Sequence, residues 1–490
     1  MSERDPTATV HHARDSGASF GGQPSRPVDH LFLVLEGARP LAGGARFSLE
    51  GVDEVAIRRG SARSFSREKT GGRTILTLKV PDSILSSSHG RLVNNAGAWS
   101  LVDDGSTNGT FIDGVRIQAK GLTDGACFEM GAAHFTLRLG MPTPEGAPAD
   151  VESSNLGGSA QGNASLIPAY TEQLGAFTRI ALSGLSILLL GESGSGKEVL
   201  ASAAHALSGR KGPFVPVNCG ALTATLMESQ LFGHTKGSFS GALRDEPGFV
   251  RASDGGTLFL DEIGDLPGPS QAALLRVLET REVVPVGSTR AVPVDLRVVS
   301  ATLKSAGALR PDLHARLAGF THTLLPLRER MEDFGLVLAV LVQRNAGDRA
   351  ASLKLSPEAG RMLLEHDWPL NVRELNHALS VALTLAQGTT LEVKDFPASI
   401  RGGADNRGRP SNPDDAPPAA SAAAAPASAA PVGPPPPIPD DDASLRALVL
   451  TMLDTHGGNI SDVSRALGKT RMQVHRWMKR FDIDPTTFRK

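Results

Sequence analysis

A short run of glycines, small polar residues and one lysine is the segment whose residue types and spacing most clearly suit chemistry. It follows the apolar residues 188–190 and reads Gly191, Glu192, Ser193, Gly194, Ser195, Gly196, Lys197 and Glu198. Glycines let consecutive backbone N–H groups turn toward one phosphate chain, and a lysine adds a positive charge for the β- and γ-phosphates. The run predicts a phosphate-binding loop, although Glu198 replaces the usual hydroxyl and a surface Gly/Ser turn is the alternative on this motif alone.

Two adjacent acids farther along the chain could complete a hydrolytic site. Asp261 and Glu262 directly follow the apolar segment 256–260. We expect Asp261 to hold Mg²⁺ and Glu262 to polarise the attacking water as a general base, because phosphoryl transfer depends on positioning and charge neutralisation. With an apolar strand before each motif and both motifs in the expected order, ATP hydrolysis is favoured over a structural acidic turn.

The segments that must position these residues have the pattern of a parallel α/β sheet. Longer helical stretches separate the expected buried strands, which are residues 186–190, 214–217, 257–260 and 296–300. Short β-rich runs separated by Gly, Asn and Asp precede them, at residues 31–35, 73–80, 99–102 and 134–139. Apolar residues at helical spacing follow, in residues 451–456, 461–467 and 471–481. The fold class is therefore multidomain, with all-β, α/β and all-α parts in that order.

Composition and cysteine content indicate the cellular compartment in which the protein works. The chain has 490 residues, of which 40% are hydrophobic and 21% charged, and this length predicts several domains. Cys127 and Cys219 make neither a disulfide framework nor a metal cluster, which indicates a reducing compartment. No apolar run is long enough for a membrane span, and residues 1–29 lack the apolar core of a signal peptide. We expect a cytoplasmic protein with no membrane partner.

Low-complexity segments rich in Gly, Ala, Pro and Ser mark the expected domain boundaries. The predicted parts are a disordered lead-in at 1–27, an all-β domain at 28–141, a linker at 142–165, an α/β domain with a helical lid at 166–400, an Ala/Pro-rich linker at 401–442 and a helical domain at 443–490.

The α/β domain resembles the AAA+ domain of bacterial enhancer-binding proteins, which activate sigma-54 RNA polymerase. The family's phosphate loop also ends in Lys-Glu, and its sigma-contacting loop, Gly-Ala-Phe-Thr-Gly-Ala, is similar to Gly237, Ser238, Phe239, Ser240, Gly241 and Ala242. The resemblance implies an ATPase that remodels sigma-54 RNA polymerase holoenzyme, with Phe239 exposed as an apolar grip. From the residues alone, a flexible loop with Phe239 packed into its own core is the alternative.

Five further residues match positions with roles in that family. The resemblance implies that Asn218 holds the catalytic glutamate, that Thr302 lies in the first sensor, and that Arg373 reads the nucleotide from the lid. Arg310 and Arg316 match the arginines that reach a neighbouring subunit's γ-phosphate, although each alone could be a surface salt bridge. Hydrolysis that depends on a neighbour's arginine implies a ring oligomer, a hexamer.

The all-β domain resembles forkhead-associated (FHA) domains, which are β-sandwiches that bind phosphothreonine. Residues 104–111 and the following Asp113-Gly114 resemble the family signature. The candidate phosphopeptide residues are Arg59, Ser86, His89, Thr107 and Asn108. Together they offer the guanidinium, hydroxyl and amide donors that a phosphate needs. The resemblance implies input from a phosphothreonine-bearing protein or a Ser/Thr kinase; the alternative is a degenerate scaffold.

The helical tail resembles the Fis-type helix-turn-helix that ends most enhancer-binding proteins. It carries more Lys and Arg than Asp, and its candidate DNA-contacting residues are Arg471, Gln473, His475, Arg476, Lys479 and Arg480. The resemblances together predict a sigma-54-dependent transcriptional activator that binds enhancer DNA, uses ATP and Mg²⁺, and is controlled by phosphothreonine recognition. The alternative is an AAA+ DNA-binding regulator that does not contact sigma-54.

Overall fold

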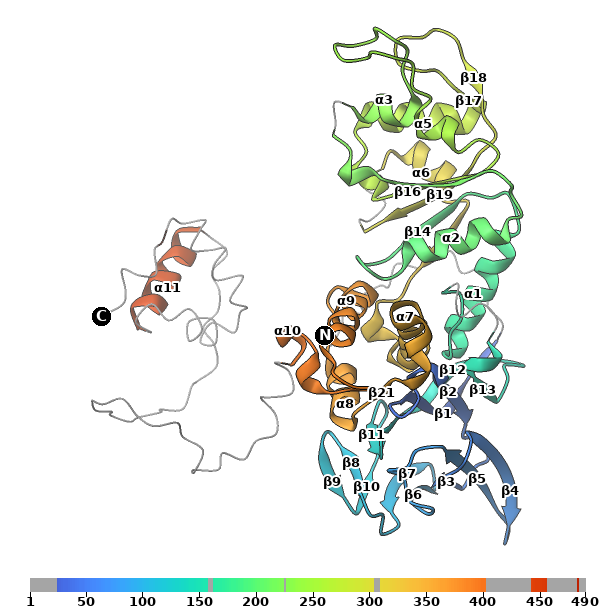
Figure 1. The fold of residues 1–490 in the computed structure, drawn as a ribbon, viewed down its shortest axis with the longest axis vertical. Coiled ribbons are helices and arrows are strands. Elements are labelled where there is room, and N and C mark those ends of the chain that lie inside the picture. The colour runs from blue at the N-terminus through green and yellow to red at the C-terminus, as the bar shows by residue number, and fades with distance from the viewer. Residues whose placement is uncertain are drawn as a thin grey trace, which may run out of the picture. The chain divides into compact units, whose positions relative to one another are not determined.

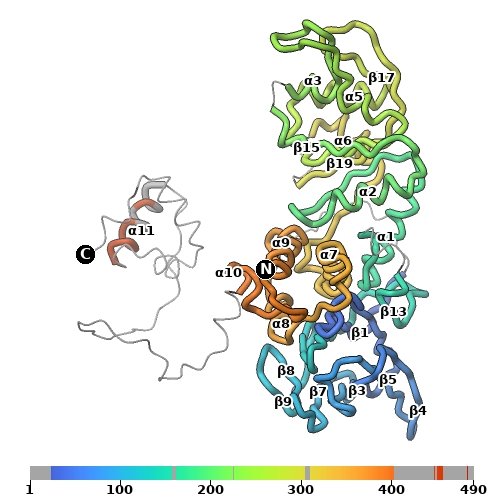
Figure 2. Tube along the Cα trace, in the orientation of Figure 1, coloured from blue at the N-terminus to red at the C-terminus, as the bar shows by residue number. Residues whose placement is uncertain are grey.

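The computed structural model describes residues 24–156, 162–223, 226–303, 309–401, 442–455 and 483. The chain divides into two units, Met1–Pro410 and Ser411–Lys490. Figure 1 labels their helices and strands, and Figure 2 traces the same chain from blue to red. Among the described residues, no helix is both long enough and apolar enough to cross a membrane.

The first domain is a sandwich of two sheets, with strand orders β13-β2-β1-β12-β11-β8-β9 and β10-β7-β6-β3-β5-β4 (Figure 1). Its elements are β1 Ser25–Glu36, η1 Pro40–Ala42, β2 Ala45–Ser48, β3 Glu54–Arg59, β4 Ser64–Thr70, β5 Arg73–Val80, β6 Gly90–Asn95, β7 Ala98–Asp103, β8 Thr110–Ile112, β9 Val115–Ile117, β10 Ala119–Gly121, β11 Cys127–Met130, β12 Ala133–Pro144, β13 Asp150–Glu152 and η2 Ser153–Asn155. Side chains from both inner faces, including Leu33, Trp99 and Phe135, form one buried cluster. The expected all-β part is confirmed, because its alternating apolar residues fill the space between the sheets.

The segment expected to be a linker at 142–165 begins inside this sandwich. β12 continues to Pro144, which pairs with Ser25 of β1, and β13 pairs with β2. The expected end of the domain at residue 141 is therefore wrong. These strands pair through backbone hydrogen bonds. A segment of Gly, Ala and Pro without apolar spacing therefore gives no sequence signal for them.

The second domain contains a five-stranded parallel sheet of order β15-β16-β19-β14-β20. Its strands are β14 Ile187–Leu190, β15 Phe214–Asn218, β16 Thr257–Asp261, β19 Arg297–Thr302 and β20 Phe320–Thr323; its helices are α1 Pro168–Ala181, α2 Lys197–Leu207, α3 Met227–Phe232, α4 Gly248–Ala252, α5 Gly268–Thr280 and α6 Pro311–Leu317. One face packs against Phe177 and Leu200, and the other against Leu274 and Leu313. Because both faces are covered, the strands are continuous apolar runs, and the four expected strands are confirmed. β20 was missed, since Phe-Thr-His-Thr carries little apolar signal.

A helical lid follows the sheet. It comprises α7 Phe334–Ala346, α8 Pro357–Glu365, α9 Asn371–Leu385, α10 Ala398–Arg401 and a short parallel pair, β21 Lys354–Leu355 with β22 Thr390–Leu391. α8 begins at Pro357, and the Ser356 hydroxyl accepts the Ala359 N–H at 3.1 Å, a normal N-cap. Trp368 and Phe334 lie fully buried in the lid's core.

In the second unit the structure describes one helix, α11, Asp442–Thr455. It includes most of the first helical segment expected in the tail. The six candidate DNA-contacting residues, Arg471 to Arg480, lie outside the described residues.

Candidate nucleotide and phosphopeptide sites

The phosphate-binding loop connects β14 to α2, as its sequence predicts. Gly194 and Gly196 adopt φ angles of +74° and +108°, which a side chain would disfavour. A Cβ at Gly196 would meet nothing within 4 Å, so the loop is open there. The Ser195 hydroxyl is buried and, within the described residues, has no hydrogen-bond partner. An open turn with an unsatisfied buried hydroxyl fits a phosphate group.

Lys197 is the first residue of α2 and is buried. Its ammonium donates to the carbonyl oxygens of Gly191 at 3.0 Å and Glu192 at 3.1 Å. Burial lowers the pKa of Lys197, while the negative charges of Asp261 and Glu262 oppose that shift. Both acids therefore lie close enough to act on the charge of Lys197.

The two acids lie at the carboxyl end of β16. Glu262 adopts φ +53°, a left-handed conformation that is uncommon for a residue with a side chain and is concentrated at functional sites. A Cβ on Gly220 would lie 2.5 Å from Glu262 Oε2 and 3.4 Å from Asn218 Oδ1, so both side chains gather at this glycine. Asn218 also accepts the Ala221 N–H at 3.1 Å. The predicted neighbours Asn218, Asp261 and Glu262 are thus brought together.

The protein residues fit a Mg²⁺ ion held jointly with substrate phosphates. Among the described residues, no group of three or more His, Cys, Asp or Glu side chains could hold a metal. Mg²⁺ commonly binds through one or two carboxylates, waters and substrate phosphates, so Asp261 next to a phosphate loop suits it. Thr302 ends β19, pairs in register with Leu190 and is buried at the same edge of the sheet.

The lid reaches the phosphate loop from the other side. Arg373 donates to the Ser193 hydroxyl at 2.8 Å, as expected of a lid arginine near the nucleotide. Sequence reasoning missed Asn371, whose amide donates to Glu192 Oε2 at 3.1 Å and to the Ser193 carbonyl at 3.0 Å. Asn371 adopts φ +56°, which asparagine tolerates better than most residues.

Two arginines just before α7, which the sequence did not predict, also bind the phosphate loop. Arg328 pairs with both Glu192 oxygens, at 2.5 and 2.7 Å. Hydrogen bonds from Arg328 and then Asn371 lower the pKa of Glu192 to about 2. Buried Arg330 donates to the Ser195 carbonyl at 3.1 Å. Their sequence signal was weak, because isolated arginines are common on surfaces.

The two candidate neighbour-reaching arginines are both exposed and paired with nearby acids. Arg310 binds the Asp312 carboxylate at 2.7 and 3.1 Å, and Arg316 lies 3.6 Å from Glu279. The side chain of Arg310 is 48% exposed, and that of Arg316 is 60% exposed. Surface pairs of this kind contribute little stability, so either arginine can exchange its partner.

The segment Gly237–Ala242 forms a tight loop. Gly237 donates to the Ala242 carbonyl at 2.8 Å, and Ala242 donates to the Phe239 carbonyl at 3.0 Å. Phe239 is half-buried, with its ring centroid 5.0 Å from that of His234. Phe239 is therefore less exposed than expected, because its ring packs against His234, which precedes the loop. The exposed apolar side chain is Leu243, 84% accessible, which was missed.

In the sandwich, three loops bring the candidate phosphopeptide residues together. Arg59 donates its N–H to the Ser86 carbonyl at 3.0 Å, and the Ser86 hydroxyl accepts the Thr107 N–H at 3.2 Å. The Asn108 amide donates to the Ile84 carbonyl at 2.7 Å. Arg59, Thr107 and Asn108 are exposed and Ser86 is half-buried, so a phosphate can approach them.

His89 lies behind this surface instead of on it. It is fully buried; Nδ1 accepts the Ser86 N–H at 3.1 Å, so we assign the proton to Nε2, which donates to the Gly109 carbonyl at 3.1 Å. Burial lowers the pKa of His89, which keeps the ring neutral. Its expected place among phosphate-contacting residues is therefore wrong, and it positions the loops that carry Ser86 and Thr107.

Comparison with known families supports each part. Residues 166–322 match the Sigma-54 interaction domain, 328–413 the AAA+ ATPase lid domain, 70–131 the FHA domain and 440–485 the Homeodomain-like domain.

Known proteins share the central part. The chain is 43% identical over 323 residues to the acetoin catabolism regulatory protein of Cupriavidus necator, covering 64% of this chain and 45% of that protein. It is 45% identical over 227 residues to the Sigma54-dependent transcriptional activator SfnR of Pseudomonas putida, covering 44% of this chain and 62% of that protein. The chain thus spans about half the length of these relatives.

Among solved structures, NtrX from Brucella abortus is similar, with 26% identity, a TM-score of 0.44, and coverage of 66% of this chain and 70% of that chain. By the family matches, the chain combines an FHA domain, a Sigma-54 interaction domain with an AAA+ ATPase lid domain, and a Homeodomain-like domain, in that order.

Proposed function

We propose that this protein is a sigma-54-dependent transcriptional activator. It binds enhancer DNA through its C-terminal domain, hydrolyses ATP in a ring oligomer and uses that energy to remodel sigma-54 RNA polymerase for open-complex formation. The observation that carries the proposal is the convergence of an open phosphate loop, Lys197, Asp261 and Glu262 at one sheet edge, with Arg373 of the lid on the same loop. Phosphothreonine recognition by the FHA domain regulates this motor.

The chain's own residues divide the work of hydrolysis. Backbone N–H groups and Lys197 neutralise phosphate charge, and Glu262 orients and deprotonates the attacking water. Mg²⁺, held through Asp261, would neutralise charge developing on the phosphate oxygens. In the ring, Arg310 or Arg316 exchanges its carboxylate partner for the phosphate of the neighbouring subunit's ATP. A guanidinium supplied in this way makes turnover depend on assembly.

The loop Gly237–Ala242 delivers the energy to sigma-54. Its Gly237 and Gly241 adopt φ angles of +81° and +114°, so the loop can change shape where other residues would resist. Leu243 is already exposed and can make an apolar contact with sigma-54. Phe239 adds a second apolar contact when its ring moves away from His234.

In vitro transcription from a supercoiled sigma-54 promoter tests the motor. We expect open complexes only with sigma-54 polymerase, ATP and the full chain. Phe239→Ala and Leu243→Ala should keep ATP turnover and lose open-complex formation, whereas Glu262→Gln should lose both. Ala339→Ser, on α7, is a control away from the loop. Transcription that is indifferent to ATP, or absent with the wild-type chain, would contradict the proposal.

Peptide binding tests the regulatory domain. Fluorescence anisotropy should show a preference for a labelled pool of degenerate phosphothreonine peptides over the same unphosphorylated pool. Arg59→Ala should weaken binding by about tenfold or more, since a charge-assisted hydrogen bond is lost. Arg58→Ala, the exposed neighbour on β3, is the matched control. Equal binding of both pools would remove phosphothreonine from the proposal.

A further inference from the structure

The FHA sandwich packs against the lid through β1 (Figure 1). Leu31 and Leu33 belong to the core of the sandwich, whereas Leu35 is fully buried in the lid's core with Phe334 and Leu338. The pairing of β1 with β12 shifts register between Leu33 and Leu35, and a bulge of this kind redirects the next side chain. One strand therefore serves two cores.

Close backbone approaches show that the contact is built into both surfaces. Leu355 of the lid donates its N–H to the Gly37 carbonyl at 2.7 Å. A Cβ on Gly335, in the first turn of α7, would lie 2.3 Å from the Val34 carbonyl oxygen. No real Cβ contact is that short, so any larger residue at Gly335 would push β1 and α7 apart.

Two ion pairs flank the apolar contact. Arg361 of α8 binds Glu129 of β11 at 2.6 and 2.8 Å, and Arg138 of β12 pairs with Glu332 before α7. Both carboxylates are more than nine-tenths buried. A buried charge left without its partner is strongly destabilising, so these pairs oppose separation of the sandwich and lid.

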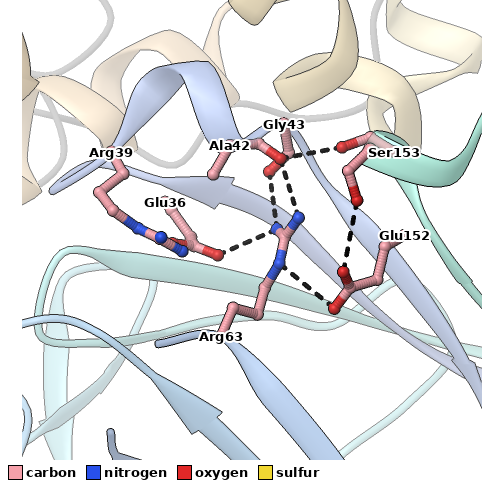
Figure 3. A network of polar contacts seen from close by, with 8 residues as sticks. Glu36, Arg39, Ala42, Gly43, Arg63, Glu152 and Ser153 are labelled. Carbon is pink, nitrogen blue, oxygen red and sulfur yellow. Dashed lines mark hydrogen bonds and ion pairs between the residues drawn. The ribbon is translucent and has the colours of Figure 1, made fainter. Parts of the chain in front are cut away.

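On the sandwich side, Arg63 lies at the centre of a network of polar contacts (Figure 3). Its guanidinium donates to Glu36 Oε1 at 3.0 Å, to the Ala42 carbonyl at 2.9 Å and to the Gly43 carbonyl at 3.3 Å, and lies 3.5 Å from Glu152. The side chain of Arg63 is 9% exposed and that of Glu36 is 1% exposed. Arg63 therefore fixes η1, the turn between β1 and β2.

η1 in turn contacts the lid. Leu41 of η1 packs against the lid's buried cluster. A cleft of about 450 Å³ opens beside it, lined on one side by Arg63 and Glu152 and on the other by Leu336 and Val340 of α7. Any shift of Arg63 thus changes the surface on which α7 rests.

The same short loop carries Arg63 and the candidate phosphate-binding Arg59. β3 ends at Arg59 and β4 begins at Ser64, so Gly60 to Arg63 form the whole β3–β4 connection. A Cβ on Gly60 would lie 2.8 Å from the Lys79 side chain, so this connection lies tightly against β5. A short, packed loop transmits a displacement at one end to the other.

The lid's first turns complete the route to the nucleotide. Arg328 and Arg330 bind the phosphate loop, and within the same six residues Glu332 pairs with the sandwich. Asp333 is fully buried and accepts the Ser165 hydroxyl at 2.7 Å and the Leu166 N–H at 2.6 Å. Residues 328–333 therefore touch the phosphate loop, the FHA domain and the chain that joins it to α1.

We propose that the β3–β4 loop, through Arg63 and η1, couples phosphothreonine binding at Arg59 to nucleotide binding beneath the lid. This inference rests on the proposed function, because it needs both ligands to bind. To the proposed function it adds a physical path, by which the FHA domain acts on the lid of the same chain. By reciprocity, nucleotide must change phosphopeptide affinity by the same factor as phosphopeptide changes nucleotide affinity.

Coupling is measured with the full chain at one protein concentration. The affinity for the labelled phosphothreonine peptide pool is determined by anisotropy, with and without a saturating non-hydrolysable ATP analogue. In the wild type we expect the two dissociation constants to differ by about fivefold or more. In Arg63→Ala we expect a difference under about twofold, with nucleotide-free peptide affinity unchanged.

Arg67→Ala is the matched control. Arg67 lies on β4, binds Asp150 at 2.5 and 3.2 Å and the Ser48 carbonyl at 2.8 Å, and so joins the same sandwich strands without touching η1. It should retain wild-type coupling. Retained coupling in Arg63→Ala, or loss in both variants alike, would overturn the proposed route.

A second variant covers the case in which Arg63→Ala does not fold. Gly335→Ala places a methyl group against β1, and Gly175→Ala in α1, whose Cβ would meet only Arg179 at 3.8 Å, is its helical control. Gly335→Ala should abolish coupling, and retained coupling would overturn the inference. A wild-type chain that binds the peptide without coupling also overturns it and leaves the proposed function standing. Equal affinity of the wild-type chain for the phosphorylated and unphosphorylated peptide pools would overturn phosphothreonine recognition itself.

Discussion

The protein has two candidate phosphate-recognition surfaces, and they are held together in different ways. Around Arg59, the hydrogen bonds of Ser86, Thr107 and Asn108 join loops of one sandwich, and buried His89 fixes Ser86 and Gly109. The nucleotide loop instead takes bonds from a separate subdomain, the lid, through Asn371 and Arg373. The first surface is preformed, whereas the second depends on where the lid lies.

This difference suits the two surfaces to the separate roles proposed for them. A preformed surface needs only a small rearrangement to bind, which favours affinity and specificity. A site shared between two bodies changes whenever one body shifts, which suits a motor that must alternate between states. Substitutions at one surface should therefore leave ligand binding at the other unchanged.

The largest effect is expected from Glu262→Gln. Removing the general base should lower ATP turnover by about 10²- to 10⁴-fold, because proton transfer contributes about that much. Phosphopeptide affinity should not change. Steady-state phosphate release and peptide anisotropy measure the two, with Asp348→Asn, exposed in η9 (Gly347–Ser352), as the charge-matched control. Turnover near the wild-type rate would remove Glu262 from the base role.

Asn371→Ala should release the lid from the nucleotide loop. The change removes bonds to Glu192, Ser193 and the Leu327 N–H, the last at 2.8 Å, and leaves alanine at φ +56°. We expect a loss of about 2–4 kcal/mol in the free energy of unfolding, and weaker ATP-analogue binding.

Arg328→Ala is the informative companion, because it removes another partner of the same Glu192. That pair is about 40% exposed on both sides, so the expected loss is below about 1 kcal/mol. Urea denaturation compares the two variants. Equal losses would mean that the lid is held by charge and not by the buried amide.

His89→Ala should damage the phosphopeptide surface alone. The Ser86 N–H and the Gly109 carbonyl would lose their buried partner, which costs about 2–3 kcal/mol of stability with the cavity included. Peptide affinity should fall while ATP turnover persists. His377→Ala, exposed on α9, serves as control. Unchanged peptide binding in a folded His89→Ala chain would show that the loops need no such support.

A pH-dependent effect concerns His134, which lies between the sandwich and the lid against Gly360 of α8. Full burial lowers the pKa of His134 from 6.5 to about 3, so the unfolded chain takes up a proton that the folded chain refuses. The stability present above pH 6.5 is therefore lost as pH falls toward 3.

Between about pH 7.5 and about pH 5.5, the wild type should lose about 1.4 kcal/mol more than His134→Gln. Buried Asp333, whose pKa is raised to about 6, acts in the opposite direction but is common to both proteins. Urea denaturation at the two pH values gives the difference, and identical losses would show that His134 titrates normally.

Local chemistry was predictable from sequence because it depends on short segments. The glycine spacing from Gly191 to Lys197 predicted a phosphate loop, and the short apolar runs before Gly191 and Asp261 predicted buried strands. Arg59, Ser86 and Thr107 were recognisable by family spacing. Arg310 and Arg316 were also named, but their role in a neighbouring subunit remains a prediction.

What only the tertiary structure decided concerns contacts between distant segments. No spacing rule connects Arg330 with Ser195, Asn371 with Glu192, or Arg63 with the turn at Ala42. Burial of His89, and packing of Phe239 on His234, likewise depend on neighbours that the local pattern does not name. The sequence by itself determined where the phosphate loop and the acid pair lie along the chain, because each is a short contiguous segment. The fold decided which parts hold them, because packing joins residues far apart in the chain.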